Sequence, residues 1–164
     1  GTDGTPGADV PATTQSQSAA PTPTSSAAGQ GGEPVSWAVV LAQLDDKRSQ
    51  AFATGNQELL GQVSKVGSVA ALRDRSLLAQ LAELGVKAVG MKATIVAVSV
   101  TRRDATSVEL AVADELSSYR IVRATSGQEV EVRPARTAKN WRVTLESIGG
   151  RWLLVDSVES SKQP

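Results

Sequence analysis

Asp114 and Tyr119 are the residues whose types and positions come nearest to a catalytic pair. Asp114 continues an alternating apolar pattern over residues 108–112 and is followed by Leu116. A carboxylate on the buried face of a strand would be partly desolvated, as a general base beside a carbonyl substrate needs to be. Tyr119 could then polarise that carbonyl through its hydroxyl group. The alternative is that Asp114 faces solvent or pairs with an arginine where the strand ends, and that Tyr119 packs with its hydroxyl at the rim.

Three arginines are candidates for binding an anionic ligand: Arg48, Arg133 and Arg136. Arg48 lies on the apolar stripe of a predicted helix, where a guanidinium needs a carboxylate partner. The sequence offers four such partners, namely Asp45, Asp74, Asp114 and Asp156. A structural ion pair therefore competes with anion binding as the role of Arg48. Arg133 and Arg136 flank Pro134-Ala135 in a charged loop, which is either solvated surface or an anion or partner site.

The composition removes most catalytic chemistry. The 164 residues include no His and no Cys, and the aromatic residues are three Trp, one Tyr and one Phe. The chain therefore lacks an imidazole base, a thiolate nucleophile and the usual ligands of zinc and iron–sulfur sites. It also lacks a calcium-loop motif and a glycine-rich phosphate cradle between a strand and a helix. We expect neither a cofactor nor a metal ion.

The charge distribution argues against nucleic-acid binding. Basic and acidic residues number 17 each, and the three acidic residues within 1–36 leave 17 basic and 14 acidic residues in 37–164. A surplus of this size is too small for an electrostatic footprint on nucleic acid, and aromatic side chains that could stack on bases are scarce. We therefore expect no nucleic-acid partner.

Three helices are predicted before any strand. The spacing of apolar residues predicts a first helix over residues 37–55. Asn56 is expected to cap a short second helix, and Ser68 or Asp74 a third one that Gly85 ends. The buried stripe of the third helix would consist of Leu77, Leu78, Leu81 and Leu84.

After Gly90 the spacing of apolar residues changes from a helical period to alternation, which predicts antiparallel strands. The expected strands cover residues 92–103, 108–113, 119–124, 129–133, 141–146 and 151–158. Gly149-Gly150 would turn the last hairpin, with Trp141 and Trp152 as a cross-strand pair that face each other or are staggered by one residue pair. Helices followed by strands predict an α+β domain, in which three N-terminal helices pack on a curved, mostly antiparallel sheet.

Residues 1–34 differ in composition from the rest of the chain. They hold five of the seven prolines and six of the fourteen glycines, among runs of Ser, Thr and Ala. Such a segment cannot bury enough apolar surface to offset the entropy of ordering, so a disordered linker is expected. The predicted organisation is a linker over 1–34, a single domain over 35–160 and a disordered end over 161–164.

The expected membrane connection lies outside this chain. Gly1 is not an initiator methionine, so the chain is expected to be a fragment or a processed product. It contains neither a signal peptide nor an apolar run long enough for a membrane span. Linkers rich in Ser, Thr and Pro commonly separate a membrane anchor from an outer domain, although they also join cytosolic domains.

Several short strings carry a family resemblance. A-F-A-T-G-N ends the first predicted helix, and W-R-V-T-L-x-x-x-G-G-R-W closes the strand region. In this order of elements the chain resembles the nuclear transport factor 2-like superfamily of cone-shaped, cystatin-like α+β domains. More narrowly, it is similar to outer domains of actinobacterial membrane proteins and lipoproteins. The matching residues are Trp37, Val40, Leu41, Leu44, Asp45, Arg48, Ala51, Phe52, Ala53, Gly67, Ser68 and Asp74.

The resemblance implies either binding or a limited set of reactions. The superfamily contains isomerases, dehydratases, cyclases and many non-catalytic modules, and its enzymes usually place Asp, His or Tyr in the open end of the cone. The absence of His excludes an Asp/His pair. We predict a non-catalytic, extracytoplasmic binding or assembly domain of a membrane-tethered protein, which acts on a protein partner or a small ligand; pairing into a homodimer is a further option. The alternative is a small isomerase- or cyclase-like enzyme with Asp114 as base and Tyr119 as donor.

Overall fold

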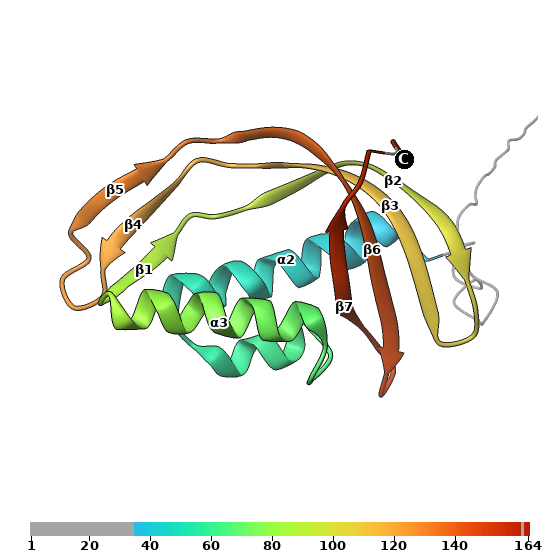
Figure 1. Cartoon of the computed structure of the whole chain (residues 1–164), viewed down its shortest axis with the longest axis horizontal. Helices are drawn as coiled ribbons and strands as arrows, with labels where there is room; N and C mark the ends of the chain where they lie inside the picture. Colours follow the sequence, from blue (N-terminus) through green and yellow to red (C-terminus); the bar gives the residue numbers. More distant parts are fainter. Residues whose placement is uncertain (1–34, 162) are drawn as a thin grey trace, which may run out of the picture. The chain divides into compact units, whose positions relative to one another are not determined.

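Helices precede antiparallel strands along the chain, as the change of apolar spacing predicts. The structure, a computed structural model, describes residues 35–161 and 163–164. The linker predicted over 1–34 and position 162 of the predicted C-terminal end lie outside the described residues. The folded unit spans Trp37–Pro164, with its helices before its strands (Figure 1). The α+β class is therefore confirmed.

Helix boundaries follow local capping rules. The helical elements are α2 (Trp37–Thr54), the 3-10 helix η2 (Gln57–Gln62) and α3 (Val69–Glu83). Gly55, at a φ of +75°, ends α2, and the Asn56 side chain accepts a hydrogen bond from the N–H of Glu58. Ser68 caps α3 by accepting from the N–H of Ala71. Asp74 is not a cap, because it lies inside α3 and is buried.

The buried face of α3 differs from the predicted leucine stripe. Leu78 is buried, whereas Leu77 and Leu84 are exposed. Positions three or four apart share one helix face, and adjacent residues lie about 100° apart around the axis. The face toward the core therefore consists of Ala70, Ala71, Asp74 and Leu78.

The strands divide into two antiparallel sheets. They are β1 (Val86–Val89), β2 (Ala93–Arg103), β3 (Ser107–Leu116), β4 (Tyr119–Arg123), β5 (Glu129–Arg133), β6 (Arg136–Ile148) and β7 (Arg151–Glu159). The strand orders are β1-β4-β5 and β2-β3-β6-β7. Strand β1 was not predicted, because it precedes the change of apolar spacing at Gly90. The α2 helix contacts β1 and β2, and α3 contacts β1 and β7.

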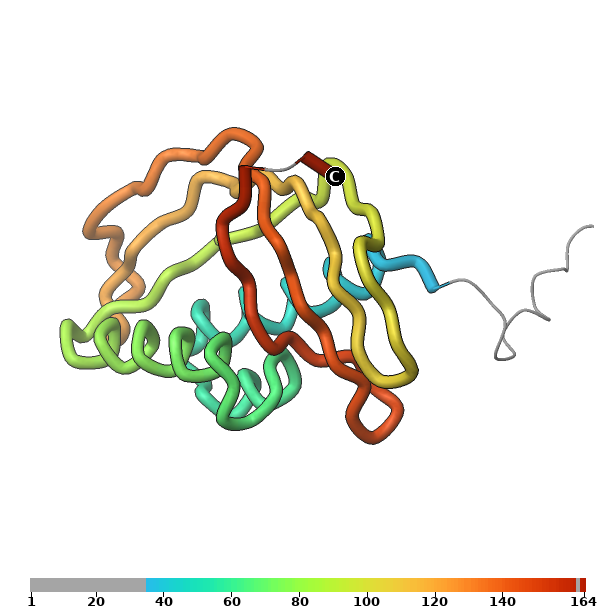
Figure 2. The backbone as a smooth tube through the Cα atoms, turned by 45° about the vertical axis from the view of Figure 1, so that its right-hand side comes forward, coloured from blue at the N-terminus to red at the C-terminus, as the bar shows by residue number. Residues whose placement is uncertain are grey.

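The predicted single sheet is interrupted where the chain passes from one sheet to the other. Figure 2 shows β1 leading into β2, β3 into β4 and β5 into β6. At this corner Ser117 donates its backbone N–H to the carbonyl of Lys92 over 2.9 Å. Its hydroxyl accepts from the N–H of Lys92 and donates to the carbonyl of Gly90. The regular strand ladder stops here because the Ser117 side chain takes the place of strand pairing. Gly90 allows the turn of the backbone, since its φ of +88° is in the left-handed region.

The last hairpin has a different register from the one that a tryptophan pair requires. Gly149 and Gly150 both have positive φ, as a two-residue turn between twisted strands needs. This turn pairs Trp152 with Ser147 and Trp141 with Glu159, so the predicted Trp141–Trp152 pair is wrong. Trp152 instead contacts the ring of Trp37 edge-on, with 4.9 Å between ring centroids.

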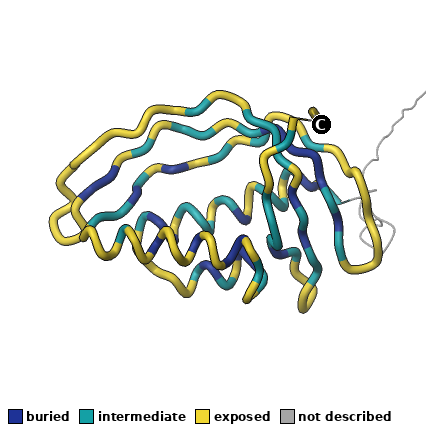
Figure 3. The backbone as a smooth tube through the Cα atoms, in the orientation of Figure 1, coloured by how far each residue is buried: buried dark blue, intermediate teal, exposed yellow. Residues whose placement is uncertain are grey.

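The packed core lies between the helices and the three-stranded sheet. Buried residues occur in the helices, in β1 and β4, and in the four-stranded sheet (Figure 3). The central cluster consists of Ala51, Phe52, Leu60, Leu78, Ala88, Met91 and Ile121. The four-stranded sheet contributes a second buried set, Val108, Leu110, Val112, Val143 and Leu145. Some of its residues border a cavity.

Candidate functional site

A cavity of about 380 Å³ opens between the helices and the four-stranded sheet. Its apolar walls include Leu41, Leu44, Ile95, Val112, Val143 and Leu154. Six charged residues also line it, namely Asp45, Arg48, Arg73, Asp74, Asp114 and Arg136. The cavity thus combines apolar walls with equal numbers of aspartates and arginines.

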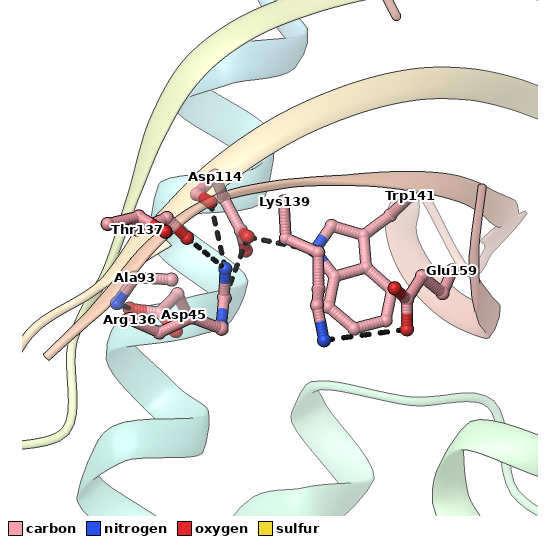
Figure 4. Close-up of polar contacts among 8 residues, drawn as sticks. All are labelled: Asp45, Ala93, Asp114, Arg136, Thr137, Lys139, Trp141 and Glu159. Atoms are coloured by element: carbon pink, nitrogen blue, oxygen red, sulfur yellow. Dashed lines mark hydrogen bonds and ion pairs between the residues drawn. The ribbon is translucent and has the colours of Figure 1, made fainter. Parts of the chain in front are cut away.

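Asp114 occupies the wall of this cavity as part of a hydrogen-bonded group (Figure 4). Its Oδ1 accepts from Nη2 of Arg136 over 2.9 Å and from Nε1 of Trp141 over 2.8 Å. Nη1 of Arg136 also donates to the main-chain carbonyls of Asp114 and Thr137. A register shift between β3 and β6 opposes Leu116 to Arg136 and so brings this arginine beside Asp114. The Asp114 carboxylate is therefore held by two donors from β6.

Tyr119 does not line the cavity with Asp114. It begins β4 and packs against the apolar cluster around Phe52. Of the two residues proposed as base and donor, Asp114 lines the cavity and Tyr119 does not. Their convergence on one substrate carbonyl, which the enzyme hypothesis needs, is not seen in this geometry.

Of the four aspartates that the sequence offers as partners, Arg48 pairs with Asp74. Nε and Nη2 of Arg48 donate to the two carboxylate oxygens over 2.8 and 2.9 Å, which is a bidentate pair between α2 and α3. The guanidinium also lies 4.9 Å from the ring centroid of Phe52. Burial by itself would lower the pKa of Arg48, but the hydrogen bonds and charge of Asp74 raise it overall. The Asp74 side chain is only 6% exposed, so this carboxylate depends on Arg48.

Arg133 and Arg136 are separated by the fold despite their proximity in sequence. Arg136 lines the cavity. Arg133 pairs with Glu131 on its own strand over 2.6 Å, with both side chains half exposed, and is not among the lining residues. The structure thus brings Arg48, Asp114 and Arg136 together around one cavity and places Arg133 elsewhere.

Asp45 and Trp141 also line the cavity, and the sequence pattern did not predict them as site residues. Oδ2 of Asp45 accepts from the N–H of Ala93, the first residue of β2, over 2.9 Å. Burial raises the pKa of Asp45, and the Ala93 hydrogen bond and the attraction of Arg48 and Lys92 oppose this only in part. The helical spacing contained a signal, because position 45 is four residues after Leu41 and three before Arg48.

No protein-family model matches this chain, and no curated protein matches it. Among solved structures, the intermembrane space region of chloroplast protein ARC6 is 17% identical, with a TM-score of 0.49, and covers 79% of this chain and 100% of that one. Aln2 from a Streptomyces species is 11% identical, with a TM-score of 0.44 and coverages of 74% and 88%. A putative calcium/calmodulin dependent protein kinase II association domain from Xanthomonas campestris is 19% identical, with a TM-score of 0.40 and coverages of 74% and 84%. With TM-scores below 0.5, these similarities do not assign the chain to a family.

Replacing Arg48 with Ala is expected to lower the free energy of unfolding by about 3 kcal/mol, because it leaves the buried Asp74 carboxylate without its partner. Urea denaturation measures this loss. The matched control is Arg133→Ala, whose exposed pair with Glu131 should contribute less than about 1 kcal/mol. The double variant Arg48→Met/Asp74→Leu, which removes both charges, should recover most of the loss. An unchanged stability of Arg48→Ala would contradict the structural role.

Replacing Asp45 with Asn is expected to change how stability depends on pH. The folded protein binds the Asp45 proton more tightly than the unfolded chain, because the folded-state pKa lies above its ordinary value of 3.8. The stability that the protonated Asp45 contributes to the folded state is therefore present at acid pH. It is lost as the pH rises through the raised pKa. The Asn variant should gain stability relative to wild type over this rise, as measured by urea denaturation at several pH values. Asp46→Asn, at the exposed neighbouring position, is the control; an equal gain there would refute the prediction.

Proposed function

We propose that this chain is a non-catalytic domain that binds a small, largely apolar ligand. The observation that carries this proposal is the cavity of about 380 Å³ with mostly apolar walls. Sites for small molecules usually have volumes of about 300–1,000 Å³ and apolar walls with a few placed polar groups. The cavity has the size and the wall chemistry of such a site.

The arrangement of the polar groups favours binding over catalysis. A general base needs a carboxylate oriented toward a proton of the substrate, with a donor on the reacting carbonyl. Oδ1 of Asp114 is instead occupied by Arg136 and Trp141, and Tyr119 packs in the core cluster. The contacts of Asp114 hold its carboxylate in the cavity wall. They do not bring Tyr119 beside it as a donor to the reacting carbonyl.

The order and packing of the elements support a nuclear transport factor 2-like cone for this domain. Three helical segments precede seven strands in the described part of the chain. Both α-helices contact the strands, and the cavity lies between them and the four-stranded sheet. In this proposal the cavity is the open end of the cone.

The proposal also includes an extracytoplasmic location and a membrane tether of actinobacterial type. Its support is the composition of residues 1–34, which is typical of the linkers between an anchor and an outer domain. Within the described residues, no helix has the length and apolar character needed to cross a membrane.

Ligand binding is tested by titrating the 164-residue chain with octanol and following backbone amide signals by NMR. The largest shifts are expected at the cavity walls. Replacing Ile95, which lines the cavity, with Trp should fill part of it and weaken binding at least about tenfold. The control Val96→Trp adds the same side chain at the next position of β2, which is exposed. It should leave binding unchanged. No saturable binding by wild type, or an equal loss in both variants, would overturn the proposal.

The location is tested by adding a protease to intact cells of the source organism and probing with an antibody against Trp37–Pro164. We expect the domain to be released without cell lysis, because a linker of this composition is an accessible site for cleavage. A cytoplasmic protein is the control. Protection of the domain until lysis would exclude the extracytoplasmic location.

A further inference from the structure

The charges that line the cavity are paired, with one exception. Arg48 pairs with Asp74, and Arg136 pairs with Asp114. Arg73 pairs with Asp156 of β7 over 3.2 Å. These three pairs use every arginine that lines the cavity. Asp45 is the remaining charged residue of the lining, and in the part of the chain that the structure describes no cation lies within ion-pair distance of it.

The carboxylate of Asp45 retains acceptor capacity. A carboxylate has two oxygens and about four lone-pair positions. Within the described residues it receives one hydrogen bond, from the N–H of Ala93 to Oδ2. Lys92, which directly precedes Ala93, pairs with the exposed Asp46 over 3.5 Å. Figure 4 shows Asp45 at the Ala93 backbone, and Asp45 lines the same cavity as Asp114 and Arg136.

We propose that the cavity selects a ligand with a single positively charged amine on an apolar body, and that Asp45 is the counter-ion of that amine. This inference rests on the proposed function, since it assigns the head group of the ligand that the cavity binds. The apolar body would contact apolar side chains of the lining, such as Leu41, Leu44 and Ile95. An ammonium group donates up to three hydrogen bonds, which suits an acceptor whose capacity is only partly used.

Other head groups fit these charges less well. An anionic head group would meet arginines that are already paired and would lie beside the unpaired Asp45. A metal ion would need several ligands, and the described residues contain no group of three or more His, Cys, Asp or Glu that could hold one. A charge-assisted hydrogen bond in a partly desolvated site is stronger than a neutral one, so an amine should also be preferred over an alcohol.

The experiment compares three ligands that share one apolar chain: octylamine, octanol and octanoate. Each is titrated into the 164-residue chain at about pH 7, where the amine is protonated, and dissociation constants are measured by NMR. We expect octylamine to bind wild type about tenfold more tightly than octanol, and octanoate to bind more weakly than octanol. In Asp45→Asn, which keeps an acceptor for Ala93, the ratio of the octylamine and octanol dissociation constants should approach one, because the amine loses its counter-ion. Asp46→Asn removes the same charge outside the cavity and should retain the preference for octylamine.

The outcomes separate this inference from the proposed function. If octanol binds in the cavity but octylamine has no advantage, or if Asp45→Asn keeps that advantage, the amine assignment is wrong and the apolar cavity still binds ligands. If none of the three ligands binds, the proposed function fails together with the assignment. Loss of octylamine preference in Asp46→Asn would show attraction to the general surface charge, which also overturns the role of Asp45.

Discussion

The bidentate ion pair between Arg48 and Asp74 connects the packed core of this domain to its cavity. On one side, the Arg48 guanidinium lies over Phe52, which belongs to the central apolar cluster. On the other side, both members of the pair line the cavity. Two ionised side chains can lie at the boundary between the core and a hollow space because their attraction and bidentate hydrogen bonds offset the cost of desolvation. The same contact joins α2 to α3 beside the cavity.

The cavity is maintained by interruptions in regular structure as well as by packing. At the corner between the two sheets, the Ser117 hydroxyl bonds to the backbone of Gly90 and Lys92 in place of a strand ladder. Nearby, the register shift between β3 and β6 brings Arg136 to the Asp114 oxygen that also accepts from Trp141. Regular antiparallel pairing would send alternate side chains to opposite faces. The irregular pairing instead collects polar side chains at the cavity wall and satisfies their hydrogen bonds.

Local interactions made much of the fold predictable from the sequence. Several features depend only on residues that are neighbours in the sequence. They are the end of α2 at Gly55, the start of α3 at Ser68, the turn at Gly149-Gly150 and the change to strand periodicity. The lack of His and Cys limited the chemistry in the same direct way. The site could be predicted only as separate residues, and Arg48, Asp114 and Arg136 were among them. Their partners could not be chosen, because an ion pair depends on distance in space.

Only the tertiary structure decided which of these residues act together. Arg48 and Asp74 are 26 positions apart, and Asp45 meets the N–H of Ala93 across 48 positions. Helical or strand periodicity places a side chain on a face of its own element, but the packing of elements determines what that face meets. For this reason Asp74 was one of four candidate partners of Arg48, and Tyr119 was predicted beside Asp114 although it packs in the core. The sequence determined the elements and the kinds of charge available; the packing of helices against sheets determined which carboxylate was left unpaired.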